Sequence, residues 1–130
     1  MFVFIYAELQ PEPTYVYQKP ILAKIKNCFP KVDCLDVDAY SEEFLMSQAC
    51  QVAEQAESCV VYFNSPDPDI SLGASVRLAE VLIRRQQKSQ VILQGENQRL
   101  ERLFTNRDYL TFFKNPEEEL LFQNLEDFYR

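Results

Sequence analysis

The side chains best suited to chemistry follow two apolar runs that have the composition of β-strands. Glu8 ends the first run, residues 2–7, and a polar loop follows the second run, residues 58–63. This loop carries Asn64, Ser65, Asp67, Asp69 and Ser71. Carboxylates and hydroxyls in such positions could hydrogen-bond the hydroxyl groups of a ribose, and a carboxylate could attack or stabilise a ribosyl carbon.

Each of these acids also has a structural interpretation. The two prolines of the loop shape a turn, and Asp69 or Ser71 could cap the helix that follows. Glu80 is a second candidate catalytic carboxylate, about two turns along that helix from Gly73, which is roughly 11 Å. It could equally be a solvated surface residue. Glu8 is the better placed carboxylate, because it ends a strand.

Three tyrosines belong to loops near the same carboxylates. Tyr15 and Tyr17 lie in a proline-containing segment, residues 10–19, and Tyr40 follows an apolar run at residues 32–37. Their rings could stack on a nucleobase. They could also pack on the rim of the core or in a subunit interface. The sequence therefore suggests a nucleoside- or nucleotide-like small molecule as ligand, and a homo-oligomer.

The composition excludes several classes of site. The chain has no histidine, so a histidine base cannot form within it. The four cysteines form no C-x-x-C pair, which predicts no zinc finger and no other metal site. With only Gly73 and Gly95, the chain has neither a P-loop nor a dinucleotide fingerprint, and it lacks the phosphate loop of flavodoxins. We expect no cofactor.

Charge and hydropathy limit the partners further. A formal net charge of −7 at pH 7 disfavours both nucleic acid and an anionic membrane surface. The N-terminal apolar run is short and has no basic flank, unlike a signal peptide or a membrane span. Reduced thiols are then the default, so the sequence predicts a cytoplasmic protein.

Strand-like and helix-like segments alternate along the chain. The predicted strands are residues 2–7, 32–37, 58–63, 90–93 and 109–113, and the predicted helices cover residues 20–29, 42–56, 72–88, 97–104 and 116–128. Ser41 is expected to cap the second helix. Its apolar stripe would be Phe44, Leu45, Ala49, Val52, Ala53 and Ala56, and the third helix would bury Leu72, Val76, Ala79 and Ile83.

This alternation predicts one α/β domain over residues 1–130. The expected architecture is a three-layer, doubly wound, five-stranded and mostly parallel sheet with the flavodoxin-like order 2-1-3-4-5. Ligands of such sheets bind at the carboxyl ends of the strands, where the strand order reverses. Here that point lies between the first and third strands, which directs attention to residues 8–17, 38–40 and 64–71.

Two stretches resemble known families. Residues 2–8 are similar to the opening strand of TIR domains, and residues 53–66 to their helix, strand and serine-containing loop. Nucleoside 2-deoxyribosyltransferases share this layout over about residues 1–85. The resemblance implies a flavodoxin-like fold with either protein–protein interaction or N-glycosidic bond cleavage. The transferases carry their catalytic glutamate four residues after the helix glycine. This chain has Arg77 there, and Glu80 is the nearest acid.

Phospho-receiver domains have the same topology. Lys114, after the last strand, resembles their lysine, although the third strand ends in Asn64 rather than aspartate. Three hypotheses follow: a ligand-binding or protein-interaction domain without a complete catalytic site, an N-ribosyl hydrolase or transferase acting on nucleosides or NAD, and a degenerate receiver-like signalling module.

Overall fold

The computed structural model describes residues 1–85 and 87–130 and contains a five-stranded sheet. Its strands are β1 (Phe2–Glu8), β2 (Asp33–Asp38), β3 (Ser58–Ser65), β4 (Ser89–Gly95) and β5 (Leu110–Lys114). All neighbouring strands are parallel and their order is β2-β1-β3-β4-β5. The predicted flavodoxin-like order is therefore confirmed, with a sheet that is wholly rather than mostly parallel.

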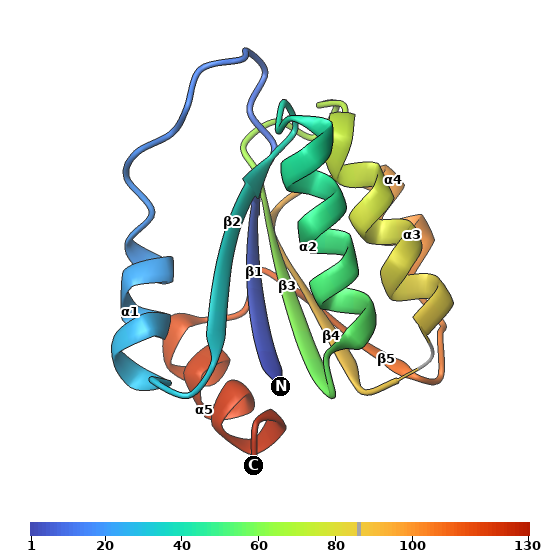
Figure 1. Ribbon diagram of the computed structural model, residues 1–130. Coiled ribbons are helices and arrows are strands. Elements are labelled where there is room, and N and C mark those ends of the chain that lie inside the picture. The colour runs from blue at the N-terminus through green and yellow to red at the C-terminus, as the bar shows by residue number, and fades with distance from the viewer. Residues whose placement is uncertain (86) are drawn as a thin grey trace.

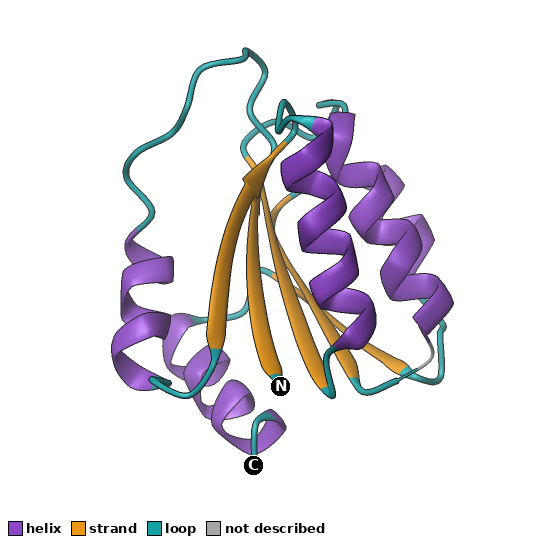
Figure 2. Ribbon diagram, in the orientation of Figure 1, coloured by secondary structure: helices purple, strands orange, loops and turns teal. Residues whose placement is uncertain are grey.

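The helices cover both faces of the sheet, which confirms the three-layer architecture (Figure 1). One face carries α1 (Pro20–Cys28) and α5 (Glu118–Phe128), while the other carries α2 (Glu43–Gln55), α3 (Val76–Arg85) and α4 (Gln98–Phe104). Figure 2 shows that a long irregular segment, residues 9–19, connects β1 to α1. None of the described helices combines the length and the hydropathy that a bilayer crossing requires.

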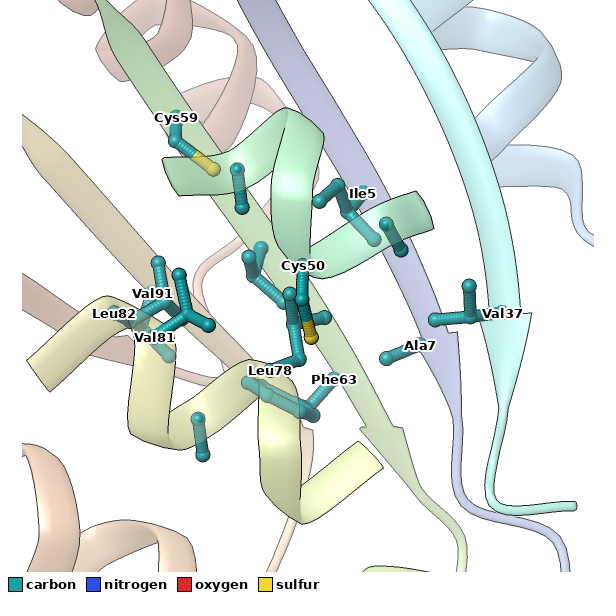
Figure 3. Packing of buried hydrophobic residues seen from close by; sticks show 14 of the residues in the cluster. Ile5, Ala7, Val37, Cys50, Cys59, Phe63, Leu78, Val81, Leu82 and Val91 are labelled. Carbon is teal, nitrogen blue, oxygen red and sulfur yellow. The ribbon is translucent and has the colours of Figure 1, made fainter. Parts of the chain in front are cut away.

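Alternate residues of each strand point into two separate cores. The larger core, under α2, α3 and α4, takes Ile5, Val61 and Phe63 from the sheet (Figure 3). Cys59 is fully buried there, as the sequence predicts for a small apolar residue. The smaller core, under α1 and α5, includes Phe4. Burying both faces explains why the central strands are continuous apolar runs rather than alternating ones.

Local sequence sets several helix ends. Pro20 occupies the first turn of α1, where a missing N–H leaves no hydrogen bond unmade. Asn97 caps α4, because its side-chain oxygen accepts a hydrogen bond of 3.1 Å from the backbone N–H of Leu100. Both helices were predicted close to their observed bounds.

The start of α2 differs from the prediction. Ser41 does not cap the helix. Its hydroxyl instead accepts a 2.9 Å hydrogen bond from the backbone N–H of Asp38 and closes the turn after β2. Phe44 and Leu45, predicted to face inward, are 70% and 50% exposed. The reason is the rotational phase of the helix: its buried face is Met46, Ala49, Cys50 and Ala53, which leaves Phe44 and Leu45 outside that face.

The start of α3 also differs. A single 3-10 turn, Gly73–Ser75, precedes the helix and has no side-chain cap, so neither Asp69 nor Ser71 caps it. The helix therefore starts three residues after Gly73, and its buried face shifts. That face consists of Leu78, Ala79, Val81, Leu82 and Arg85, with Val76 and Ile83 only partly buried.

Candidate ligand-binding site

Polar side chains form a row across the carboxyl end of the sheet, on the face that carries α1 and α5. Glu8 is in register with Asp38 on β2 and with Asn64 on β3, and Asn64 is in register with Gln94 on β4. In-register residues of neighbouring strands project from the same face. The topology therefore assembles these groups at the point where the strand order reverses, between β1 and β3.

One step further into the sheet, the same face carries two tyrosines. Tyr6 and Tyr62 are in register on β1 and β3, and their rings stack with centroids 5.3 Å apart and planes 19° apart. Both are almost completely buried. They form an aromatic floor directly below the row of polar side chains.

The segment Gln10–Lys19, here called the strap, runs over this face and is held at both ends. At its start, the backbone N–H of Ala39 donates to the Gln10 side-chain oxygen at 3.2 Å. The Tyr40 hydroxyl donates to the carbonyl of Pro11 at 2.8 Å. The strap is thus anchored to the loop that follows β2.

At its other end, the strap is anchored to Asp36 on β2. The Lys19 ammonium lies 2.6 Å from one carboxylate oxygen of Asp36, and the Tyr15 hydroxyl donates to the other at 2.6 Å. The same ammonium lies 4.1 Å from the centroid of the Tyr15 ring, a cation–π contact. The Lys19 side chain is only 5% exposed, so this ion pair is shielded from water.

A cleft of about 470 Å³ remains between the strap and the sheet, and we call it the strap cleft. Its volume is within the usual range for small-molecule sites. Its walls are Tyr6, Glu8, Gln10, Pro11, Val16, Gln18, Pro20, Ile21, Tyr62, Asn64 and Pro66. No lysine or arginine is among them, and Glu8 is the one acidic residue.

The Glu8 carboxylate is held in a fixed orientation within this cleft. One of its oxygens accepts a hydrogen bond of 3.0 Å from the Tyr6 hydroxyl, and the other accepts one of 2.8 Å from the Asn64 amide. Glu8 is only 4% exposed, and no lysine or arginine in the described part of the chain forms an ion pair with it. A buried carboxylate without a cation is costly for folding, so its presence calls for a reason.

Burial and the nearby carboxylate keep both floor tyrosines protonated. Burial, and next the negative charge of Glu8, raise the pKa of Tyr6 far above its usual value. The same two causes raise the pKa of Tyr62 to about 12. Both phenols therefore remain neutral hydrogen-bond donors near neutral pH. The cleft combines these donors with the Glu8 carboxylate and with amide groups on Gln10, Gln18 and Asn64.

The structure brings together only some of the residues predicted from sequence. Glu8 and Asn64 meet in the strap cleft, whereas Tyr15 and Tyr40 anchor the strap from outside it. Ser65 points to the opposite face of the sheet, where it is buried and its hydroxyl contacts the carbonyls of Asp67 and Glu96.

The remaining predicted residues lie outside the cleft. Asp67 is exposed and accepts a hydrogen bond from the backbone N–H of Asp69, and Ser71 accepts one from that of Gly73. Glu80 lies in a groove of about 390 Å³ between α2 and α3, across the sheet from Glu8. Lys114 forms ion pairs with Glu101 at 3.1 Å and with Glu96 at 3.7 Å.

Sequence reasoning missed the two tyrosines of the floor and the Asp36–Lys19 pair. Tyr6 and Tyr62 stand in apolar runs that predict strands, but each lies two residues before a predicted site residue, Glu8 or Asn64. The period of two along a strand places such pairs on one face, and this signal could have found them. The described residues contain no cluster of three or more metal-ligating side chains.

Comparison with protein-family models, with curated proteins and with solved structures finds no match to this chain. The class of molecule is therefore defined by the fold and the cleft: a flavodoxin-like α/β domain with an acidic, aromatic-floored cleft at its switch point. The resemblance to TIR domains and nucleoside 2-deoxyribosyltransferases stays a prediction.

Proposed function

We propose that this domain binds a small, hydroxyl-rich ligand of the nucleoside class in the strap cleft. The observation that carries the proposal is the buried Glu8 carboxylate, oriented by Tyr6 and Asn64 without a cationic partner. Each oxygen of a carboxylate can accept more than one hydrogen bond. Glu8 therefore keeps acceptor capacity for a ligand hydroxyl or amine.

The other walls of the cleft fit the same ligand. Aromatic and aliphatic side chains contact the flat face of a base or sugar, and the Gln10 and Gln18 amides supply both donors and acceptors. No lysine or arginine is among the walls, and the Lys19 ammonium, 5.6 Å from the Tyr6 ring, is already paired with Asp36. A phosphate would therefore find no free counter-charge in the cleft. A neutral nucleoside is thus a better fit than a highly charged nucleotide.

The test is a titration of the full chain with nucleosides, mononucleotides, NAD and sugar phosphates, measured by thermal shift and calorimetry. A bound ligand at about 100 times its Kd raises stability by roughly 2.7 kcal/mol, which shifts the Tm by several degrees. Glu8→Gln should weaken binding about tenfold or more, because a hydrogen bond to a charged group contributes more than one to a neutral amide. No shift with any compound would contradict the proposal.

Glu12→Gln is the matched control. Glu12 lies on the strap but is exposed and outside the cleft walls, so this variant makes the same change in charge without touching the ligand. Its affinity should stay within about twofold of the original, since exposed charges contribute little. Equal losses in the two variants would assign the effect to overall charge instead of to the cleft.

A second candidate function is cleavage of an N-ribosyl bond. What favours it is the way each Glu8 oxygen is held by a different donor, an arrangement that orients a nucleophilic carboxylate. The test is release of a free base from nucleosides or of nicotinamide from NAD. Loss of that release in Glu8→Gln, with retention in Glu80→Gln and Asp69→Asn, would assign the reaction to the cleft. No release by the original chain would reject it.

A cytoplasmic location is part of the same proposal. All four cysteines are unpaired, and a reducing compartment keeps thiols in that state. Fractionation of cells that express the chain, with an antibody against it, tests this location directly.

A further inference from the structure

The helices α1 and α5 lie toward the amino ends of the strands, away from the carboxyl edge (Figure 1). A second concave surface lies between them. It has a volume of about 810 Å³ and continues into a hollow of about 350 Å³ that shares three of its residues. We call it the α1/α5 groove. Its walls are Cys28, Phe29, Glu119, Phe122, Gln123, Glu126 and Tyr129.

The floor of the α1/α5 groove is aromatic. Phe29 on one side and Phe122 on the other have parallel rings, 3° apart in plane, with centroids 6.3 Å apart. Tyr129 lies 5.9 Å from Phe29, centroid to centroid, and its hydroxyl donates to the carbonyl of Val3 at 2.6 Å. Because Phe29 and Phe122 are only partly buried, their ring surface remains open to a partner.

The rim of the groove is acidic. Glu119 and Glu126 project from α5 and are exposed, whereas the neighbouring Glu118 is neutralised by Lys24 at 2.6 Å. Arg130 contacts Glu126 at 3.8 Å in an exposed pair, which screens that charge only weakly. The acidic charge is thus on the α5 side of the groove, where Phe122 lies between Glu119 and Glu126. The α1 side carries Lys24 in its pair with Glu118.

We propose that the α1/α5 groove is the docking site of a basic amphipathic helix from a partner protein. A groove between two helices accepts a third helix by the same ridge-and-groove packing that joins helices within a domain. The apolar stripe of that helix would cover Phe29 and Phe122, and its lysines or arginines would face Glu119 and Glu126. A second copy of this chain is a poor occupant, because each copy carries a net charge of −7.

The probe for this surface is a synthetic amphipathic helix of leucine and lysine, about 14 residues long. It is titrated into the full chain, with amide chemical shifts recorded by NMR and affinity measured by fluorescence anisotropy. The expected shifts concentrate on α1 and α5, and the affinity falls as salt rises. Shifts spread evenly over the acidic surface, or no binding, would overturn the proposal.

Two double variants distinguish binding in the groove from attraction to the negative net charge of the whole chain. Glu119→Lys with Glu126→Lys should lower the affinity for the probe at least tenfold, an effect on the order seen for close interfacial charges. Glu42→Lys with Glu43→Lys makes the same change in net charge beside the exposed Phe44 and Leu45, and should cost less than about threefold. Equal losses would overturn the proposal.

Two further measurements complete the test. Circular dichroism should show the helix content of the original chain in both double variants. Because Glu43 and Glu119 lie in the first turns of α2 and α5, where a lysine opposes the helix dipole, each double variant should lower the Tm slightly and by a similar amount. Sedimentation of the chain alone distinguishes a second copy from a partner: self-association that Glu119→Lys with Glu126→Lys abolishes would make another copy the occupant and overturn the proposal. A monomer that binds the probe supports it.

Discussion

The two faces of this sheet are built from the same strands, yet they differ at the carboxyl edge. On β1, residues 3, 5 and 7 face α2 and α3 and are apolar to the end of the strand. Residues 4, 6 and 8 face α1 and α5 and change from phenylalanine to tyrosine to glutamate. The same change occurs on β3, where Val60 is followed by Tyr62 and Asn64.

The difference arises from the segments that pack over each face of the sheet, because both faces belong to the same strands. On one face α2 and α3 run alongside the sheet up to its carboxyl edge (Figure 1). The polar groups at that edge, Ser65 and Asn97, are buried and hydrogen-bonded to each other at 3.4 Å. On the other face α1 starts only at Pro20, and the strap takes its place near the edge. A strap of irregular chain leaves a cleft that a helix would fill, so polar side chains can be placed there without losing access to a ligand.

The largest effect expected from this comparison is on stability, which should fall by different amounts when two neighbouring residues of β3 are truncated. Phe63 is completely buried under α2 and α3, and Phe63→Ala should lower the free energy of unfolding by about 4 kcal/mol, because it leaves a closed cavity. Tyr62→Ala should cost less, about 3 kcal/mol, because the space it opens joins the strap cleft and can fill with water. Chemical denaturation measures both, and equal costs would contradict the comparison.

The sequence predicts the fold better than the site, for physical reasons. Continuous apolar strands alternating with amphipathic helices constrain the topology, and the positions of Pro20 and Asn97 fix helix starts locally. The switch point then predicts Glu8 and Asn64 as neighbours. The sequence determines the rotational phase of a helix less well. If α2 started one or two residues earlier or later, Phe44 would change between facing the core and facing the solvent.

The floor and the strap are less evident in the sequence. Tyr6 and Tyr62 stand in apolar runs, and only their spacing of two residues from Glu8 and Asn64 places them on the face of the site. The runs themselves do not show that helix cover is missing there. The ion pair between Lys19 and Asp36 joins segments 17 residues apart, and no local pattern specifies it. Asp67 and Glu80 were favoured for their chemistry, but their positions depend on a loop conformation and a helix register that the sequence does not fix.

A pH titration gives the next largest effect. Burial and the charge of Glu8 raise the pKa of Tyr62 from 10.0 to about 12, so the folded state holds this proton after the unfolded chain has lost it. The contribution is complete below pH 10 and is lost as the pH rises toward 12, by about 2 kcal/mol. Denaturation at several alkaline pH values should show a smaller loss in Tyr62→Phe. If Tyr62→Phe lost as much stability at alkaline pH as the original chain, or if the control Tyr17→Phe behaved like Tyr62→Phe, Tyr62 would not be the cause of the loss.

The smallest expected effect tests whether the strap is anchored by a shielded ion pair. Burial lowers the pKa of Lys19, but contacts with Asp36 and Tyr15 raise it more, so it ends above 10.5, and the anchor should hold up to that pH and weaken above it. At neutral pH, Lys19→Met should lower stability by about 1 kcal/mol and speed chymotryptic cleavage at Tyr17 several-fold.

Lys24→Met is the control for this prediction, because the Lys24–Glu118 pair has the same 2.6 Å separation but both of its side chains are about half exposed. An exposed pair contributes little, so this variant should change stability by less than about 0.5 kcal/mol and leave the cleavage rate of the strap unchanged. If the two variants behaved alike, shielding by the strap would not explain the strength of the Lys19 anchor. The two faces of the sheet would then differ in the polarity of their side chains, but the Lys19–Asp36 pair would not be what holds the strap on its face.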